Sequence, residues 1–281
     1  MTNNFYNMYL HLDRSSEFCT RDGILTVHSQ RLNKQMGISH GFTTRMGGVS
    51  PVPFDTLNFS FSRADSPENV RENFRLLSNS RGLDYKSLVL VNHEHGNKAI
   101  RVNKADCGRG LFKEPLPHCD GLVTDDPDVT LITIHADCGG VFLYDDEKRA
   151  IGLAHSGWKG TLNRMGQRLV ETMVNEYGSN PHTVKAALGP CICFDCFEVD
   201  ESLAEEFVAE FGCSQISKPG RTGKAYVDIE TALCIQLLEA GIQPSNLSLM
   251  HRCTVEESEL FYSYRRDGKR TGAMASYLRL I

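Results

Sequence analysis

The chain has 281 residues, of which 41% are hydrophobic and 23% charged, and its formal net charge is −5. Without a run of basic residues, nucleic acid is an unfavourable partner. The first residues are polar and no apolar stretch approaches eighteen residues, so neither a secretory leader nor a membrane span is expected. We therefore expect a cytoplasmic protein. Its ten cysteines are too sparse for a disulfide scaffold and should be reduced.

The apolar patterns predict strands and helices mixed along one domain that covers residues 1–281, with residues 1–36 as an N-terminal lead-in. This mixture indicates an α/β (α+β) fold in which helices cover a mixed β-sheet, and it is compatible with a monomer. Ser66 is the expected N-cap of the first long helix. In chain order the predicted elements are a helix over 67–78, a strand over 87–91, strands over 131–135, 141–144 and 150–154, and helices over 161–177, 201–211 and 230–240.

Two reactive side chains lie where predicted strands end. Cys138 lies just before the strand over 141–144, and His155 directly follows the strand over 150–154. A short charged turn over 145–148 joins the two strands. After His155 the chain passes through glycines into a predicted helix, whose N-terminus would attract anions. A site at these strand ends is therefore expected.

A second histidine belongs with this pair. His95 follows the buried strand over 87–91 and precedes Gly96, which permits a turn. Two imidazoles and a thiolate suit Zn²⁺ at roughly 2.0–2.3 Å and leave a fourth position open for water or substrate, as in catalytic zinc sites. A buried cysteine beside two hydrogen-bonded histidines is the alternative.

Taken together, the motifs resemble the YfiH-type family, which is also labelled polyphenol oxidase or laccase-domain protein and includes purine nucleoside phosphorylases. The resemblance covers nearly the whole chain. It rests on residues 40–50 (HGFTTRMGGVS), Leu57-Asn58, Asn73, His95-Gly96, residues 118–124 (HCDGLVT), Ala136-Asp137-Cys138, residues 155–160 (HSGWKG), Gly189-Pro190, Cys253-Thr254 and residues 261–267 (FYSYRRD).

The resemblance implies a layered sandwich and a zinc ion bound by His95, Cys138 and His155. With zinc in such a pocket we expect phosphorolysis of adenosine, inosine or methylthioadenosine, and deamination of adenosine where the metal activates water instead of phosphate. Two departures from the family pattern are visible: His93-Glu94 replaces the usual residues before His95, and Gly139-Gly140 follows Cys138 where a proline is common. His93 is a competing ligand or a residue of the site entrance.

The remaining candidates concern substrate and proton transfer. Arg45 lies beside a glycine turn and is expected at the pocket mouth, where it would bind phosphate. Trp158 could stack on a base or pack beneath the strands. Lys159 replaces the arginine that is common in the family and would contact an anion without a bidentate fork. Asp137 is expected to carry a proton or to orient a ligand.

A separate cysteine pair, Cys193 and Cys196, has the two-residue spacing of zinc ligands. A single pair is weak, and no second pair follows at finger-like distance, so we expect ordinary cysteines here. The pair also fails the deaminase pattern of His-x-Glu followed by Pro-Cys-x-x-Cys, because Glu94 directly follows His93.

Four functions remain open. A zinc-dependent purine nucleoside enzyme is favoured. A cysteine hydrolase would use Cys138 as nucleophile and His155 as base. A non-catalytic interaction protein that retains an old site is the third. Copper-dependent phenol oxidation is the poorest, because the chain has only ten histidines and the pair His93/His95 is its one His-x-His sequence.

Overall fold

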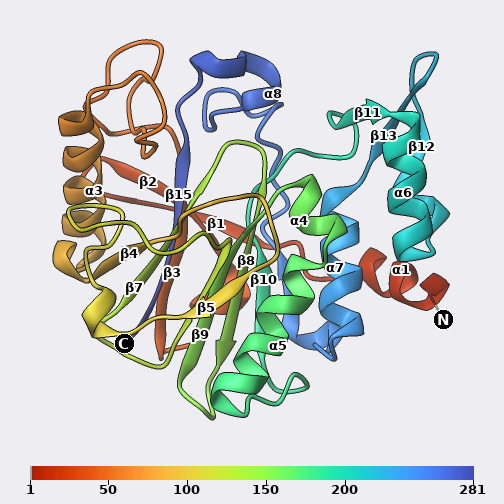
Figure 1. Ribbon diagram of the computed structural model, residues 1–281, viewed down its shortest axis with the longest axis horizontal. Coiled ribbons are helices and arrows are strands. Elements are labelled where there is room, and N and C mark those ends of the chain that lie inside the picture. The colour runs from red at the N-terminus through yellow and green to blue at the C-terminus, as the bar shows by residue number, and fades with distance from the viewer. Residues whose placement is uncertain (1) are drawn as a thin grey trace.

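The computed structural model describes residues 2–281 and confirms the mixed α/β sandwich (Figure 1). The structure divides the central strands between two six-stranded sheets, each with parallel and antiparallel neighbours. Sheet one has the order β1 (Ser16–Arg21), β2 (Ile24–Ser29), β3 (Ile38–Thr43), β15 (Met274–Leu280), β7 (Thr130–His135), β4 (Leu88–Leu90). Sheet two has the order β14 (Leu247–Leu249), β10 (Lys185–Leu188), β8 (Gly139–Asp145), β9 (Ala150–Ser156), β6 (Gly121–Thr124), β5 (Ala99–Arg101).

Helices cover the outer faces of the two sheets. In Figure 1, α3 (Pro67–Arg81) lies at the left, beside sheet one, while α5 (Met165–Tyr177) and α7 (Ile229–Glu239) lie on the other side. Ser66 caps α3 as expected, because its side chain accepts from the backbone N–H groups of Glu68 and Asn69. The shorter elements are α1 (Thr2–Leu10), α2 (Gln30–Asn33), α4 (Trp158–Leu162), α8 (Tyr264–Asp267), and the 3-10 helices η1 (Tyr85–Ser87), η2 (Lys104–Asp106), η3 (Ser214–Ile216), η4 (Pro244–Asn246) and η5 (Gly268–Arg270).

The core follows these layers. Between the two sheets, buried side chains such as Phe42 of β3 and Phe142 of β8 form one apolar cluster. Phe74 of α3 packs with Ile132 on the outer side of sheet one, and Leu169 of α5 packs with Val141 on the outer side of sheet two. The central strands of both sheets are therefore covered on both faces, which explains why they are continuous apolar runs.

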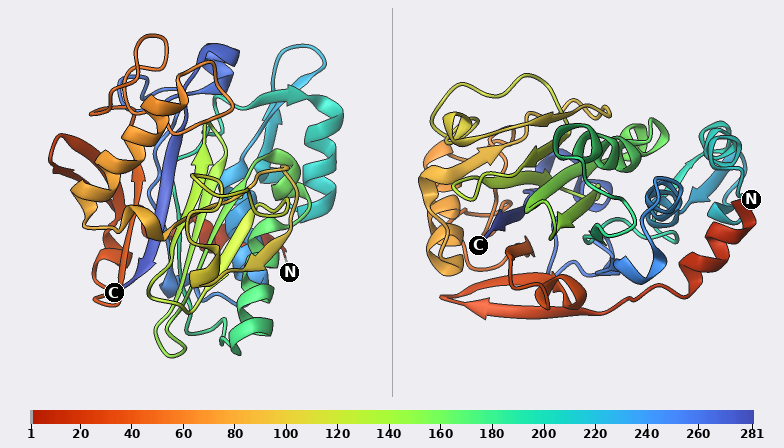
Figure 2. Two further views of the ribbon diagram at one scale, coloured as in Figure 1. Left: turned by 60° about the vertical axis from the view of Figure 1, so that its left-hand side comes forward. Right: turned by 90° about the horizontal axis from the view of Figure 1, so that it is seen from below.

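A smaller sheet stands apart at one edge. It consists of β11 (Glu198–Asp200), β13 (Lys224–Val227) and β12 (Ser217–Pro219), and α6 (Glu201–Phe211) packs against it. Both views in Figure 2 show this part as a projection beside the main sandwich. The bounds of α6 agree with the helix predicted over 201–211.

One predicted helix needs correction. The helix predicted over 161–177 is two helices, because Arg164 between α4 and α5 has a left-handed backbone and its guanidinium binds Glu210 and Glu239. The N-terminal lead-in contributes β1 and β2 to the edge of sheet one. Within residues 2–281, no helix is both long and apolar enough to cross a membrane.

Candidate active site

The site forms where the chain passes from one sheet to the other. β7 ends at His135 in sheet one and β8 begins at Gly139 in sheet two, so Cys138 lies on the connection between them. β8 and β9 are antiparallel, with Gly140 opposite His155. This register brings Cys138 next to His155 although the two residues are seventeen positions apart in the chain.

Asp120 holds the other half of the site in place. Its fully buried carboxylate accepts hydrogen bonds from the backbone N–H groups of Gly96 (2.8 Å) and His95 (3.1 Å). The same carboxylate lies 3.0 Å from Nδ1 of His155. One side chain on the connection before β6 thus fixes the turn that carries His95 and the ring of His155, leaving Nε2 of His155 free for other partners.

His95, Cys138 and His155 converge as the sequence predicted. Each offers a ligand atom, and these atoms lie within 4.8 Å of one another. Gly157 permits this approach, because a Cβ at that position would lie 2.9 Å from the Cys138 sulfur. A thiolate and two imidazoles in this arrangement can hold Zn²⁺, and Asp120 supplies the second-layer carboxylate that commonly orients such histidines.

The electrostatics favour a charged state of this cluster. Burial alone would lower the pKa of His155, but the Cys138 thiolate and the hydrogen bond to Asp120 outweigh burial and raise it to about 9. Burial also raises the pKa of Asp120, yet its hydrogen bond with His155 and its backbone donors lower it overall. The ionised Asp120 carboxylate is thus stabilised beside the His155 ring.

A cavity of about 1010 Å³ opens above the three residues. The strand-end cluster, the small sheet and the loop over residues 59–63 all contribute to its walls. Aromatic and basic side chains line it: Phe59, Phe61, Arg63, Trp158, Phe197, Lys224, Tyr264 and Arg265. Apolar walls with few convergent polar groups are typical of small-molecule sites.

Two further histidines line the cavity but have partners within the protein. Both ring nitrogens of His135 are engaged, Nε2 with Thr133 Oγ1 and Nδ1 with the carbonyl of Cys138. Nε2 of His93 accepts from the backbone N–H of Ile134 at 3.3 Å. Burial lowers the pKa of both rings well below the usual value, so both are neutral. His93 still offers a ligand atom within 4.8 Å of those of Asp120 and His155, so it stays a competing ligand.

Asp137 lies at the cavity wall, but its carboxylate is already bound. One oxygen accepts from the Thr254 hydroxyl at 2.7 Å and the other from the backbone N–H of Arg265 at 2.7 Å. These contacts tie the connection before β8 to the segment that begins α8. Each oxygen thus has one protein partner, which fixes the position of the carboxylate at the cavity wall.

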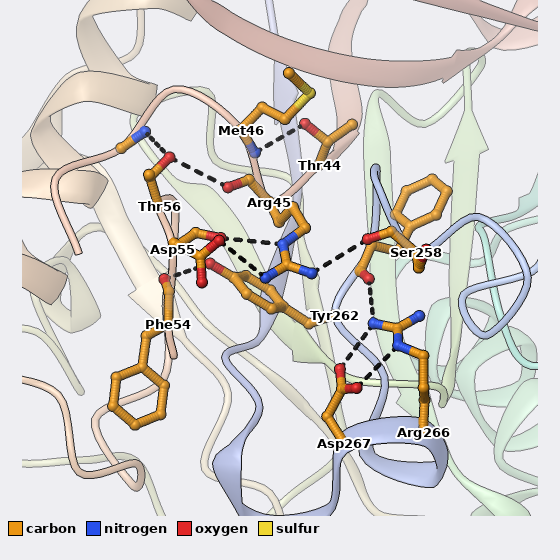
Figure 3. Close-up of polar contacts among 12 residues, drawn as sticks. Thr44, Arg45, Met46, Phe54, Asp55, Thr56, Ser258, Tyr262, Arg266 and Asp267 are labelled. Atoms are coloured by element: carbon orange, nitrogen blue, oxygen red, sulfur yellow. Dashed lines mark hydrogen bonds and ion pairs between the residues drawn. The ribbon is translucent and has the colours of Figure 1, made fainter. Parts of the chain in front are cut away.

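The structure places Arg45 outside this cavity, which corrects its expected position at the pocket mouth. Its guanidinium donates to the carbonyls of Asp55 and Ser258 at 3.0 and 3.2 Å, pairs with the Asp55 carboxylate at 3.3 Å, and lies over the Tyr262 ring (Figure 3). Arg45 therefore joins the loop after β3, which carries both Arg45 and Asp55, to the segment between β14 and α8.

Trp158 lies at the cavity and is 39% exposed, so its ring is accessible to a ligand. Lys159 does not line the cavity, and its ammonium group lies over the Trp158 ring at 5.3 Å. The helix that both residues belong to has only five residues and therefore a small dipole, contrary to the expectation of an anion-binding helix N-terminus.

Sequence reasoning missed two residues. Asp120 belongs to the quoted motif at 118–124, and a carboxylate next to a strand start was a detectable signal. Arg63 had no local signal. In the structure its Nε is buried without a hydrogen-bond partner at the cavity wall, which makes it a candidate for contacting an anion.

Comparison with known proteins agrees with the motifs. A family model described as "Multi-copper polyphenol oxidoreductase laccase" matches residues 39–281. The purine nucleoside phosphorylase YlmD of Bacillus subtilis is 34% identical over 85% of this chain and 87% of its own length. A purine nucleoside phosphorylase of Deinococcus radiodurans is 38% identical over 87% of this chain and 90% of its own length.

Solved structures support the same assignment. The crystal structure of YlmD from Geobacillus stearothermophilus superposes with a TM-score of 0.88 and 28% identity, covering 95% of this chain and 99% of that one. A Bacillus licheniformis protein named YfiH gives a TM-score of 0.87 with 29% identity over 94% of this chain and 99% of that one. The chain therefore belongs to the YfiH-type family, whose model bears the laccase description and whose relatives are named purine nucleoside phosphorylases.

Proposed function

We propose that this protein is a zinc-dependent purine nucleoside phosphorylase that cleaves adenosine, inosine or methylthioadenosine, with deamination of adenosine as a second reaction of the same pocket. The observation that carries the proposal is the convergence of His95, Cys138 and His155 on the floor of an aromatic-lined cavity. The names of the two bacterial relatives, both purine nucleoside phosphorylases, support the substrate class.

The donor set fits zinc better than a multi-copper centre. One thiolate and two imidazoles suit Zn²⁺ with an open fourth position. A laccase-type centre needs several further free imidazoles, and the neighbouring His135 has both nitrogens engaged. Zinc bound at this site would supply a Lewis acid that polarises a phosphate oxygen for phosphorolysis or a water molecule for deamination.

The cavity wall can recognise the nucleoside. The rings of Phe61, Trp158 and Tyr264 line the cavity and are between 37% and 46% exposed. A basic side chain lies over one face of each ring, so a flat purine would stack on the other face. Asp137 and Asp120 hold the loops around the floor, so that the ribose would meet a fixed surface. Fixed positioning of two reactants is itself a large part of catalysis.

Phosphate is best placed beside Arg63. Phosphorolysis joins a phosphate oxygen to C1′ of the ribose, breaks the bond from C1′ to the base, and releases the base with a proton. The Arg63 guanidinium lies over the Tyr264 ring, and its Nε has no hydrogen-bond partner, whereas the head groups of Lys224 and Arg265 donate to Asp200 and to the carbonyl of Cys196. Arg45, engaged elsewhere, has no part in this proposal.

The test is a nucleoside panel assayed with and without phosphate. We expect free base from at least one purine nucleoside only when phosphate is present, and inosine from adenosine if deamination also occurs. Arg63→Ala should raise KM for phosphate more than KM for the nucleoside, while Arg45→Ala should lower thermal stability and leave both KM values nearly unchanged. No base release from any nucleoside by zinc-loaded protein would refute the proposal.

One observation favours a second candidate, a cysteine hydrolase. Cys138, His155 and Asp120 form a continuous thiol, imidazole and carboxylate series, the geometry of a nucleophile, base and orienting acid. His95 has no role in such a triad. A hydrolase would remain active after chelation and lose activity to thiol alkylation, whereas the zinc enzyme would lose activity on chelation and regain it with added zinc.

A further inference from the structure

A second cluster of metal-binding residues lies away from the proposed active site. Cys193, Cys196, Cys253 and Glu256 each offer a ligand atom, and the four atoms lie within 4.8 Å of one another. Cys253 is buried, the other two thiols are half-buried and Glu256 is exposed, so the cluster sits at the rim of the fold. None of these residues belongs to the proposed catalytic centre.

Two short turns bring the four residues together. Cys193 and Cys196 are separated by two residues, and the turn is closed by a hydrogen bond from the Cys196 N–H to the Cys193 carbonyl. Cys253 and Glu256 have the same two-residue spacing. The second ligand pair, which the sequence seemed to lack, is thus a cysteine and a glutamate. Cys253 lies fifty-seven positions after Cys196.

The backbone holds these turns side by side. A backbone bridge pairs Cys191 with Cys253, with the Cys191 N–H donating to the Arg252 carbonyl and the Thr254 N–H to the Cys191 carbonyl, both at 3.1 Å. The spacing of the ligand atoms therefore does not depend on flexible side chains alone. Preformed geometry of this kind is what a bound ion requires.

Donor groups surround the Cys253 sulfur. It accepts hydrogen bonds from the backbone N–H groups of Cys193, Val255 and Glu256 and from the Cys193 thiol. Amides directed at a cysteine sulfur stabilise the thiolate form that ligates metals. The Cys196 thiol in turn lies 3.7 Å from the Glu256 carboxylate.

We propose that Cys193, Cys196, Cys253 and Glu256 form a second, structural zinc site. Three thiolates exclude Mg²⁺ and Ca²⁺, which prefer oxygen ligands, and the carboxylate favours Zn²⁺ over Cu(I). Tetrahedral zinc with Zn–S bonds of roughly 2.3 Å places its sulfurs roughly 3.8 Å apart, so small side-chain movements suffice. Four protein ligands close the coordination shell, as in structural sites.

A zinc ion at this site would stabilise one wall of the cavity. Ile192 and Phe197 flank the first turn and line the cavity, and the carbonyl of Cys196 accepts from the Arg265 guanidinium at 3.0 Å. The ion would tie this wall to the segment that carries Thr254, the partner of Asp137. The site thus acts on the shape of the pocket and takes no part in bond making.

The test measures zinc in a His155→Ala background, in which the first site is disabled. We expect about one equivalent of zinc per chain to remain, with a sulfur-rich shell by X-ray absorption at the zinc edge. Adding Cys193→Ser and Cys196→Ser should remove this zinc, and adding Glu256→Gln, an exposed and structurally mild change, should weaken its retention against a chelator. Cys107→Ser, a half-buried cysteine outside the cluster, is the matched control and should change nothing.

The outcomes separate this site from the proposed function. Failure of the nucleoside assay leaves the second zinc unaffected, because its retention is measured without activity. Absence of zinc in the His155→Ala protein, zinc that survives the paired cysteine substitutions, or a disulfide among Cys193, Cys196 and Cys253 after trapping of thiols would each overturn the proposal.

Discussion

Two pairs of histidines in this protein have nearly the same geometry and opposite chemistry. The rings of His28 and His40 meet edge to face with centroids 5.3 Å apart, and those of His95 and His155 do so at 5.1 Å. His28 contacts the Thr26 hydroxyl at 2.6 Å and His40 accepts from the Ser29 N–H at 3.1 Å, both neutral groups. His155 instead has a carboxylate and a thiol as neighbours.

The pKa values follow these partners. Burial lowers the pKa of His28 to about 4 and that of His40 to about 3, so both stay neutral at physiological pH. His155 is as buried as they are, yet its anionic partners raise its pKa to about 9. Proximity of two imidazoles therefore does not make a metal site, because anionic partners and free ring nitrogens decide it.

Removing one ring from each pair tests this difference most strongly. His155→Ala should abolish nucleoside cleavage and zinc binding at the first site, because it removes a proposed ligand and leaves Asp120 without its imidazole partner. His40→Ala removes an equally buried ring and should lower stability while the folded protein keeps its zinc and its activity. Metal analysis and nucleoside assays on the folded fraction decide the matter, and equal zinc loss in both variants would contradict the comparison.

Removing only the negative charge beside His155 should have a smaller effect. Asp120→Asn keeps the shape but weakens the contacts to His155 and to the N–H groups of His95 and Gly96. Substituting such an outer-layer partner typically costs about 10–100-fold in metal affinity or activity. Competition with a chelator measures the affinity, and wild-type zinc affinity in this variant would show that Asp120 serves the fold alone.

Crowding the Cys138 sulfur is a milder perturbation. In Gly157→Ala the new Cβ would meet this sulfur at 2.9 Å, although the backbone φ of −80° accepts alanine without strain. Overpacking of this kind costs about 1–3 kcal/mol and should weaken zinc binding. The control is Gly139→Ala, whose Cβ would meet the end of the flexible Leu233 side chain at 3.0 Å, and it should retain zinc. Equal zinc affinity in both variants would argue against the packing at Gly157.

The smallest expected effect is on the pH dependence of the free energy of unfolding, to which the neutral pair His28 and His40 contributes. Because the folded-state pKa of His40 is depressed to about 3, the unfolded chain binds a proton that the folded chain does not as pH falls below about 6.5. The free energy of unfolding should then fall by about 1.4 kcal/mol per pH unit for each such histidine. Urea unfolding between about pH 7.5 and pH 5 should show a shallower slope in His40→Gln than in wild type. An unchanged slope would mean that His40 is already charged in the folded protein.

Local signals were sufficient for much of the fold. The helix over 201–211 agrees with α6 because its caps and apolar face are local, and the strands over 131–135 and 141–144 lie within β7 and β8. The break at Arg164 could not be foreseen, because it depends on Glu210 and Glu239, which are distant in the chain. In the sequence, the apolar face of the helix predicted over 161–177 continues without a break past Arg164.

The sequence by itself determined the α/β class and proposed His95, Cys138 and His155 as one site, since motifs and strand ends are local features. Only the tertiary structure decided that Arg45 joins loops, that Arg63 faces the cavity and that Cys253 with Glu256 completes a second cluster. These outcomes depend on how separate segments pack and where each long side chain finds its partner. Such contacts arise only when the two sheets and their loops are assembled, so residue spacing in the sequence does not predict them.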